Sequence, residues 1–290
     1  MDKLPFALVL ISIFTHAYWN YLTKSSGNKH IFSALSKLCE MAIFGIPAVY
    51  FLSVTEFQPY FLLLIVVASV ITFFNYFFLS SAYKHGDLSL VYPVSRSSLL
   101  FLPIMAYLFI DERIDGTGTM AIALIFVGTL VMHLDSFSNI GVRTIIRNIN
   151  NKGSMYALLA AFSVAGYTLW DKIAITRMEP FLYFYLYTLL VTCFYNAFCF
   201  SKYSKEEIKH EWKINMSRIV QVGFLNSFTY LLVLMALVMS KATYVGGLRQ
   251  LSVVIGVFLG YKLLGEKMGI SKIAGIGISI IGGSLIYLAR

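Results

Sequence analysis

Four charged side chains stand out inside long apolar runs of the sequence, away from the polar loops. Lys37 and Glu40 share one run, whereas Arg96 and Arg249 each lie in a run of their own. A charge at the centre of a bilayer costs at least about 2.5–3.5 kcal/mol on insertion scales, so such residues tend to face a partner or a cavity. Two buried arginines could bind an anionic group, and a buried glutamate could exchange a proton.

Lys37 and Glu40 are three residues apart, which places them on one face of a helix and within pairing reach. Two interpretations carry equal weight. In the first, the pair neutralises itself and lowers the cost of insertion. In the second, Glu40 carries a proton during the protein's working cycle, with Lys37 as its neighbour.

Arg96 and Arg249 are each preceded by a disturbance in the expected helix. Arg96 lies about 12 Å from the start of its helix and Arg249 about 9 Å from the start of its own. Three residues before them are Pro93, which lacks a backbone donor, and the first glycine of Gly246-Gly247. A matched pair of Pro/Gly-interrupted helices is the best sequence pointer to a transport site. We expect at least one arginine to line a central cavity; the alternative is that each is held structurally by a carbonyl or a carboxylate.

Further polar and aromatic side chains accumulate in the same apolar runs. Taken singly, each is more often a helix-packing residue than a ligand. Together they predict a cavity that is both aromatic and polar, suited to an amphiphilic or zwitterionic small molecule. Besides the arginines, the predicted substrate-binding residues are His16, Trp19, Asn20, Asn75, Tyr92, Tyr167, Trp170, Asn226, Tyr244 and Gln250.

Motifs of enzymes and metal sites are absent from the sequence: it has no HExxH, GxSxG or GxxxxGK[ST] pattern and no paired cysteine and histidine spacing. Asp111-Glu112 could be taken for a catalytic acid pair, but the corresponding Gly265-Glu266 keeps only the glutamate. We therefore interpret Glu112 and Glu266 as structural residues at helix ends, tied to nearby bases. We expect no enzyme activity, no cofactor and no bound metal.

The composition indicates that these residues lie within a membrane protein. The 290 residues are 58% hydrophobic and 13% charged, with a mean hydropathy of +0.75, whereas a soluble domain is about 45–50% apolar and about 25% charged. The net charge of +9 comes from loop residues, where membrane orientation explains it without nucleic acid. The expected partners are a lipid bilayer and a small-molecule substrate.

Ten apolar segments are long enough to cross a bilayer, which needs about 20 residues. The predicted fold is an all-α polytopic membrane protein. The ten predicted transmembrane helices are 4–23, 31–53, 59–83, 88–110, 117–134, 153–176, 181–201, 217–239, 243–264 and 271–289. The segment 202–213 alternates Lys and Glu and is predicted to be a solvated surface segment.

The two halves of the sequence resemble each other. Residues 74–128 align on 228–282 without a gap, and the alignment pairs Glu112 with Glu266. Five helices per half is an odd number, so the second half must enter the membrane inverted, as in many secondary transporters. The predicted domains are a first repeat over 1–134, a linker over 135–152 and an inverted second repeat over 153–290.

Lys and Arg are distributed unequally between the two sides. Fourteen lie in the loops after the odd-numbered helices and six on the other side, termini included. The positive-inside rule then places both termini outside the cytoplasm. The membrane that we expect is the inner (plasma) membrane. Small residues at four-residue spacing, Gly256 with Gly260 and Gly275 with Ser279 and Gly283, permit close helix packing, either within one chain or in a homodimer.

The sequence resembles the drug/metabolite transporter superfamily, in particular ten-helix EamA-type members, over essentially its whole length. The resemblance implies transport without ATP hydrolysis, by alternating exposure of a central cavity walled by helices one to four and six to nine. It narrows the mechanism far more than the substrate. The segments that carry it are 17–20 with Lys24, 86–93, Glu112-Arg113, 167–172, 244–252 and 265–267.

The combined prediction is a secondary transporter of a small polar or amphiphilic metabolite, proton-coupled and acting as an exporter, in which Arg96 and Arg249 bind an anionic group. Replacing Arg96 with alanine should abolish transport and leave the protein folded. Three alternatives stay open: a flippase for a lipid-linked or phosphorylated headgroup, a membrane-embedded enzyme, and a non-transporting membrane subunit.

Overall fold

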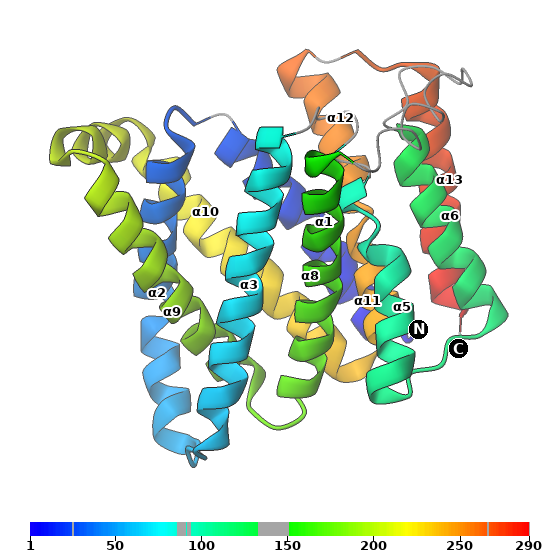
Figure 1. Ribbon diagram of the computed structural model, residues 1–290, viewed down its shortest axis with the longest axis horizontal. Helices are drawn as coiled ribbons and strands as arrows, with labels where there is room; N and C mark the ends of the chain where they lie inside the picture. Colours follow the sequence, from blue (N-terminus) through cyan, green and yellow to red (C-terminus); the bar gives the residue numbers. More distant parts are fainter. Residues whose placement is uncertain (25, 86–90, 92–93, 133–150, 266, 290) are drawn as a thin grey trace.

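The computed structural model describes all residues except 25, 86–90, 92–93, 133–150, 266 and 290, and every regular element in the described part is a helix (Figure 1). The all-α multi-pass fold class is confirmed. In chain order the helices are α1 (Lys3–Lys24), α2 (Lys29–Val54), α3 (Tyr60–His85), α5 (Ser98–Ile110), α6 (Gly116–Met132), α8 (Lys152–Ala174), α9 (Pro180–Lys202), α10 (Lys205–Met239), α11 (Ala242–Arg249), α12 (Ser252–Leu264) and α13 (Ile270–Leu288).

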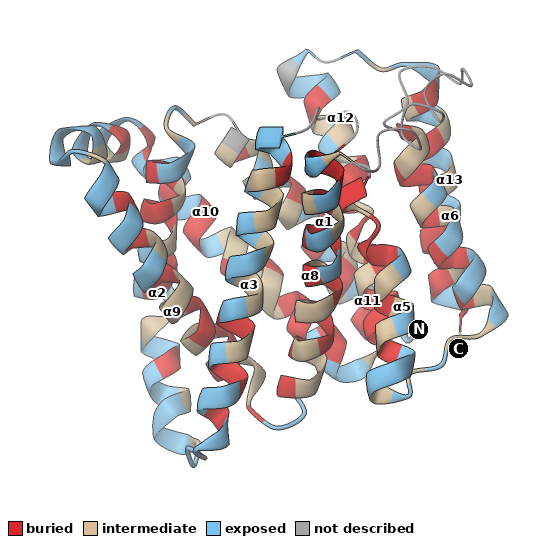
Figure 2. Cartoon of the chain, in the orientation of Figure 1, coloured by how far each residue is buried: buried red, intermediate tan, exposed pale blue. Residues whose placement is uncertain are grey.

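Length and composition allow six of the described helical segments to cross a membrane: α2, α3, α9, α10, α13 and the segment formed by α11 with α12. α5 and α6 are shorter apolar helices. Exposed positions recur along α2 and α3, as Figure 2 shows. Many of the exposed residues are large and apolar; Ile46, for example, is 83% exposed. Contiguous apolar surface of this extent is typical of a protein covered by lipid rather than by water.

The helices of the two halves pack in corresponding pairs. α1 packs along α10 and contacts α12, while α8 packs along α3 and contacts α5. The predicted repeat equates α1 with α8, α3 with α10 and α5 with α12, so each of these contacts has its counterpart in the other half. α2 packs on its own counterpart α9, and α6 on α13. This pattern is that of two halves related by a pseudo-two-fold axis. The exact domain boundaries stay a prediction, since residues 133–150 lie outside the described part.

The small residues of α13 allow close packing against α6 within the chain. A Cβ atom added at Gly282 would lie 2.8 Å from the carbonyl oxygen of Ala121, and one at Gly275 would lie 2.5 Å from that of Gly128. Any larger residue would separate the two backbones. By contrast, a Cβ at Gly256 of α12 would meet nothing within 4 Å. The stripe on α13 is therefore used inside one molecule.

α10 begins well before the predicted span at 217. Ser204 and Glu207 form a reciprocal capping box, in which each side chain accepts a hydrogen bond from the other residue's backbone N–H. One turn later the buried Glu211 accepts from the Asn28 backbone N–H at 3.2 Å. The prediction of a solvated surface segment over 202–213 is thus wrong in part: most of these side chains are exposed, but the segment from 205 is the first part of a long helix.

Candidate functional site

The helical runs that contain Arg96 and Arg249 are interrupted at equivalent positions of the two halves. α11 ends at Arg249 and α12 begins at Ser252, with a turn at 250–251 between them. In the first half, residues 96–97 form the corresponding turn before α5 begins at Ser98. The Leu251 N–H donates to the Leu248 carbonyl at 2.9 Å, a short-range bond that bends the chain without leaving the amide unpaired.

The interruption in the second half does not lie at the glycine pair. Gly246 and Gly247 are inside α11, so this part of the sequence prediction is wrong. A Cβ at Gly247 would lie 2.5 Å from Cδ1 of Ile122 and 3.1 Å from Cδ1 of Ile286, so glycine is needed for α11 to pack between α6 and α13. Pro93, the disturbance predicted in the first half, lies outside the described residues.

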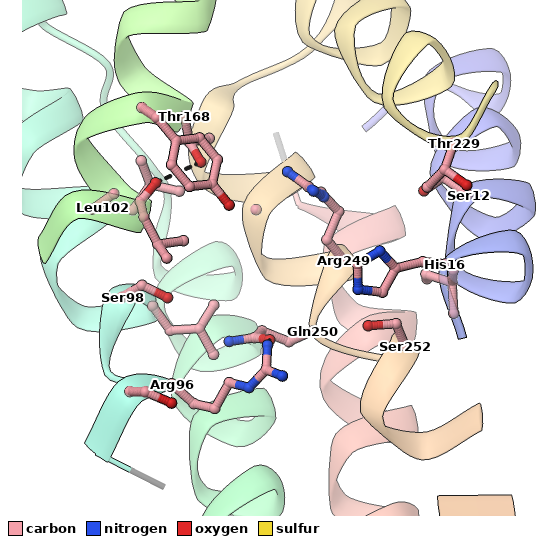
Figure 3. A pocket seen from close by; sticks show the side chains of 17 residues that line it. Ser12, His16, Arg96, Ser98, Leu102, Thr168, Thr229, Arg249, Gln250 and Ser252 are labelled. Atoms are coloured by element: carbon pink, nitrogen blue, oxygen red, sulfur yellow. Dashed lines mark hydrogen bonds between the residues drawn. The ribbon is translucent and has the colours of Figure 1, made fainter. Parts of the chain in front are cut away.

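A cavity of about 120 Å³ lies beside these two turns, between helices of both halves (Figure 3). It contains five of the predicted site residues: His16, Arg96, Tyr167, Arg249 and Gln250. Its lining includes neither Asp nor Glu among the described residues, and the charged groups found there are cationic. Sequence reasoning did not include the hydroxyl side chains that complete its polar lining, which are Ser12, Ser95, Ser98, Thr168, Thr229 and Ser252.

Arg96 joins the two halves of the molecule across the cavity. Its Nη1 donates to Oε1 of Gln250 at 3.1 Å, and these two residues occupy the same position in the two repeats, 154 residues apart. A contact between equivalent residues is expected where a pseudo-two-fold axis passes between them. Arg96 therefore lines the cavity at the junction of the halves, with part of its hydrogen-bonding capacity taken by Gln250.

Arg249 is held differently. Its guanidinium carbon lies 5.5 Å from the centroid of the Tyr230 ring, a cation–π contact. The His16 ring lies beside it in the cavity (Figure 3). Within the described part of the chain, no hydrogen bond or ion pair holds this guanidinium. An arginine has five N–H donors in a fork that matches a carboxylate or a phosphate, so Arg249 offers a ready anion-binding group.

Several predicted site residues lie away from this cavity. Asn20 is exposed and donates to the carbonyl oxygen of His16, and Asn75 donates to the Ala160 carbonyl at 3.0 Å. Trp170 donates to the Leu64 carbonyl at 2.9 Å. These three are packing interactions between or within helices.

Trp19 is close to the cavity without lining it. Its ring meets that of His16 edge to face, with centroids 5.0 Å apart, and it packs on the apolar cluster that contains Phe32 and Ile219. Its Nε1 is buried with no hydrogen-bond partner in the described residues. Trp19 thus supports His16 from behind. Tyr92 lies outside the described residues.

The Lys37–Glu40 pair is formed as the spacing predicts. Nζ of Lys37 lies 2.8 Å from Oε2 of Glu40, whose side chain is 1% exposed. The same oxygen accepts from Nδ2 of Asn226 at 3.0 Å, which connects α2 to α10. Asn226 therefore belongs to this cluster and not to the central cavity. The geometry fulfils the condition for a self-neutralised pair; whether Glu40 also carries a proton stays a prediction.

A second buried carboxylate, Asp171 of α8, was not among the predicted site residues. It is 3% exposed, and its two oxygens accept from the hydroxyls of Tyr183, at 2.7 Å, and Tyr230. The sequence contained a signal for it: Asp171 follows Thr168 by three residues, on the same helix face. Its nearness to the end of the predicted helix over 153–176 concealed that signal.

A larger, more open cavity of about 940 Å³ lies at the end of the bundle where the two termini meet. We call it the vestibule. Tyr244, predicted to bind substrate, lies here and not in the central cavity; its hydroxyl donates to Oδ1 of Asp115 at 3.2 Å. Lys172 also lines the vestibule, and its Nζ donates to the carbonyl oxygens of Leu237 and, at 2.9 Å, Ser240, which closes the end of α10.

Glu112 is bonded to backbone N–H groups of the other half, and Lys172 interacts with it electrostatically. Its carboxylate accepts from the backbone N–H groups of Ala242, at 2.7 Å, and Thr243, at 2.9 Å. A glutamate at the end of the first discontinuous helical run therefore caps the start of the second, α11, where the helix dipole favours a negative charge. Glu266, its counterpart, lies outside the described residues.

Together, these features define a multi-pass helical membrane protein with a polar cavity between two similar halves. Residues 151–288 match the EamA-like transporter family. The second half of the chain is therefore similar to that family, which is part of the drug/metabolite transporter superfamily, and the predicted resemblance is confirmed. The family indicates a membrane transporter of this type.

Solved structures support the fold over the whole chain. One crystal structure, described only as that of a protein, superposes with a TM-score of 0.72 over 99% of this chain and 96% of the other, at 14% sequence identity. At that identity the likeness shows the fold alone. No curated protein sequence matches the chain.

Proposed function

We propose that the protein is a secondary transporter that moves a small anionic metabolite, with polar or amphiphilic character, by alternating access through the central cavity. The observation that carries this proposal is the charge of the cavity. Arg249 and Arg96 line it, and in the described part of the chain no Asp or Glu joins them. An anion is the ligand that such a site stabilises, because a bidentate arginine contact is stronger than a neutral hydrogen bond.

The remaining lining supports a compact ligand that carries hydroxyl or similar polar groups. Six serine and threonine hydroxyls line the cavity. Those of Ser12, Thr168 and Thr229 donate to backbone carbonyls, and their oxygens can still accept a hydrogen bond from a ligand. The volume of about 120 Å³ is close to the roughly 150 Å³ of an engineered cavity that binds benzene. Short carboxylates and small phosphorylated compounds therefore fit better than nucleotide sugars in this conformation.

A thermal-shift screen of the purified protein tests the proposal directly. A ligand at 100 times its Kd stabilises the native state by about 2.7 kcal/mol. We expect stabilisation by members of a panel of short carboxylates and phosphates, and none by amines of similar size. Arg249→Ala should abolish the shift, while the matched surface variant Arg218→Ala, which is exposed on α10 and lines neither cavity, should retain it. Stabilisation by amines alone would contradict the anion site.

The competing function is a flippase for a lipid-linked or phosphorylated headgroup, which two cavity arginines would also suit. The cavity volume of about 120 Å³ favours a compact free ligand over a lipid-linked headgroup. Reconstituted vesicles separate the two functions. Uptake of a soluble anion supports the transporter, whereas scrambling of a fluorescent anionic lipid without such uptake supports the flippase.

The proposal also includes the orientation of the protein in the membrane and its assembly. Both ends of the chain lie side by side, where the Met1 amino group donates to the Ala289 carbonyl at 2.6 Å. We place this side and the vestibule outside the cytoplasm of a cell with an inner membrane, from the distribution of Lys and Arg. Reporter fusions at each end test it.

The exposed Gly256 face of α12 is our proposed homodimer contact, and cross-linking through a cysteine at that position tests it.

A further inference from the structure

Asp171 occupies the level of α8 between the two cavities. Thr168, one turn before it, lines the central cavity, and Lys172 and Ile173, directly after it, line the vestibule. At 1.5 Å per residue, Asp171 is only about 5 Å along the helix from the central site. Asp171 is 3% exposed and lines neither cavity.

Tyrosines, rather than a base, hold this carboxylate. The hydroxyls of Tyr183 and Tyr230 each donate to one of its oxygens, and the Tyr187 ring lies against both tyrosines, with centroids 5.2 and 6.1 Å away. In the described part of the chain, no Lys or Arg donates any of the hydrogen bonds found for Asp171. Glu40 differs in this respect, because Lys37 neutralises it at 2.8 Å.

Tyr230 connects Asp171 to the anion-binding group of the cavity. One side of its ring faces the guanidinium of Arg249 at 5.5 Å, and its hydroxyl donates to Asp171. Arg249 is also the cationic group that acts on the Asp171 carboxylate electrostatically. A ligand that neutralises Arg249 must therefore change the balance of charge at Asp171.

Among the described residues, Arg249 is the one charged group that acts on the Asp171 carboxylate. α9 contributes the tyrosines already named, and α10 contributes Tyr230. α5 has one ionisable side chain, Tyr107, and it is exposed. The five ionisable side chains of α3 are exposed as well, and α11 contributes Arg249. On α8 itself, Tyr167 faces the central cavity, and Lys172 is engaged by the carbonyl groups at the end of α10.

We propose that Asp171 is the proton-binding site that couples the protein to a proton gradient, with one proton bound for each monovalent anion carried. This inference rests on the proposed anion transport. In the empty protein, the Arg249 cation is balanced by the Asp171 carboxylate. When the anion binds at Arg249, it takes over that balance, and Asp171 binds a proton from the solvent; when the anion leaves, Asp171 releases the proton.

The proposal explains how the cavity can switch from one side of the membrane to the other both when it is empty and when anion and proton are bound. The sum of charges over Arg249, Asp171 and the ligand is zero whether the site is empty or loaded, and Arg96 adds the same single charge to both states. Moving an unbalanced charge through a low-dielectric interior is costly, so the empty and the anion-plus-proton states can both cross, and the anion alone cannot. Transport of a monovalent anion is then electroneutral.

Proteoliposomes separate binding from coupling. The probe is lactate, or the panel anion that stabilises the wild-type protein most. With a gradient of one pH unit, co-transport with one proton predicts that the anion accumulates about tenfold on the alkaline side of the membrane. Each tenfold ratio corresponds to 1.4 kcal/mol. For Asp171→Asn, accumulation should fall to a ratio of about one, while exchange of labelled for unlabelled anion at equal pH persists.

Each outcome decides a separate point. Full pH-driven accumulation by Asp171→Asn would overturn the assignment, and its loss in Glu40→Gln instead would move the coupling to Glu40. Dependence of wild-type accumulation on a potassium diffusion potential would overturn the one-to-one balance. If wild-type protein exchanges no anion at all, the proposed function fails rather than the coupling.

A direct measurement covers the case in which Asp171→Asn does not fold. Wild-type protein in weakly buffered detergent solution should take up one proton for each anion bound, detected with a pH-sensitive dye. Tyr230→Phe keeps the carboxylate but removes one donor, and it should shift the pH midpoint of this uptake. Anion binding without proton uptake would overturn the proposal.

Discussion

The two halves of the molecule interrupt their helices at equivalent positions but place their arginines differently. In the first half, Arg96 is in the turn itself, and it donates across the pseudo-two-fold axis to Gln250. In the second half, Arg249 is the last residue of α11 and rests on Tyr230. The repeat thus reproduces the backbone interruption, while the side chains at it have diverged. One arginine connects the halves, and the other offers its charge to a ligand.

Arg249→Ala should have the largest effect. Removing the guanidinium takes away a charge-assisted, bidentate contact, so we expect anion affinity to fall about 100-fold. Arg249→Lys should recover part of that loss, because it restores the charge without the planar fork. Ligand-dependent melting curves measure both. Equal affinities for wild type and Arg249→Ala would show that the two arginines do not differ as the geometry indicates.

Arg96→Ala should abolish transport but weaken binding less, by about tenfold, since part of its hydrogen bonding is directed at Gln250. Binding and uptake measured on the same preparation distinguish the two effects. Size-exclusion chromatography controls for folding. A variant that transports normally would remove Arg96 from the site.

Glu112→Ala should act on stability rather than on affinity. The substitution removes the acceptor for two backbone N–H groups at the start of α11, a loss of about 1 kcal/mol for a helix cap. We expect a lower melting temperature and an unchanged shift on adding ligand. Glu179→Ala, which removes the cap of α9 far from the cavity, is the matched control.

Gln250→Leu sharpens the role of the link between the halves. It removes the acceptor for Arg96 and leaves the turn at 250–251 in place, so we expect about threefold weaker binding and slower transport. Gln250→Glu should weaken binding further, because a carboxylate at this point would compete with the anion for Arg96. A gain in affinity for Gln250→Glu would contradict an anionic substrate.

Asn20→Ala should have the smallest effect, below twofold on binding. Its side chain is exposed and bonded to the carbonyl of its own helix. An exposed variant of this kind ordinarily changes stability by less than about 0.5 kcal/mol. A binding loss comparable to that of Gln250→Leu would show that the cavity extends to this face of α1 in another conformation.

Prediction from the sequence succeeded where the cost of burying polarity is large. Charges inside apolar runs are rare in membranes, so Arg96, Arg249 and the Lys37–Glu40 pair stood out and lie where partners or a cavity accommodate them. It failed where the meaning of a residue depends on its neighbours. Gly246-Gly247 was interpreted as an interruption, yet the pair is helical and is required by the approach of Ile122 and Leu102.

Asp171 shows the same limit from the other side. Near the end of a predicted helix, an aspartate is ordinarily assigned to the solvated boundary. Only the packing of α9 and α10 over it, which brings the hydroxyls of Tyr183 and Tyr230 to its oxygens, makes it a buried group. No local pattern contains that information, because the three residues come from three different helices.

The sequence by itself determined the class of the protein, since lipid requires long apolar segments whose backbone groups are satisfied within each helix. It also determined the doubled architecture and the two arginines, because repeat spacing and misplaced charge are visible along the chain. The tertiary structure alone decided which polar residues share a cavity, that Glu112 caps a helix of the other half, and that Asp171 lies between two cavities. Those relations depend on distances between helices, which hydropathy and spacing do not encode.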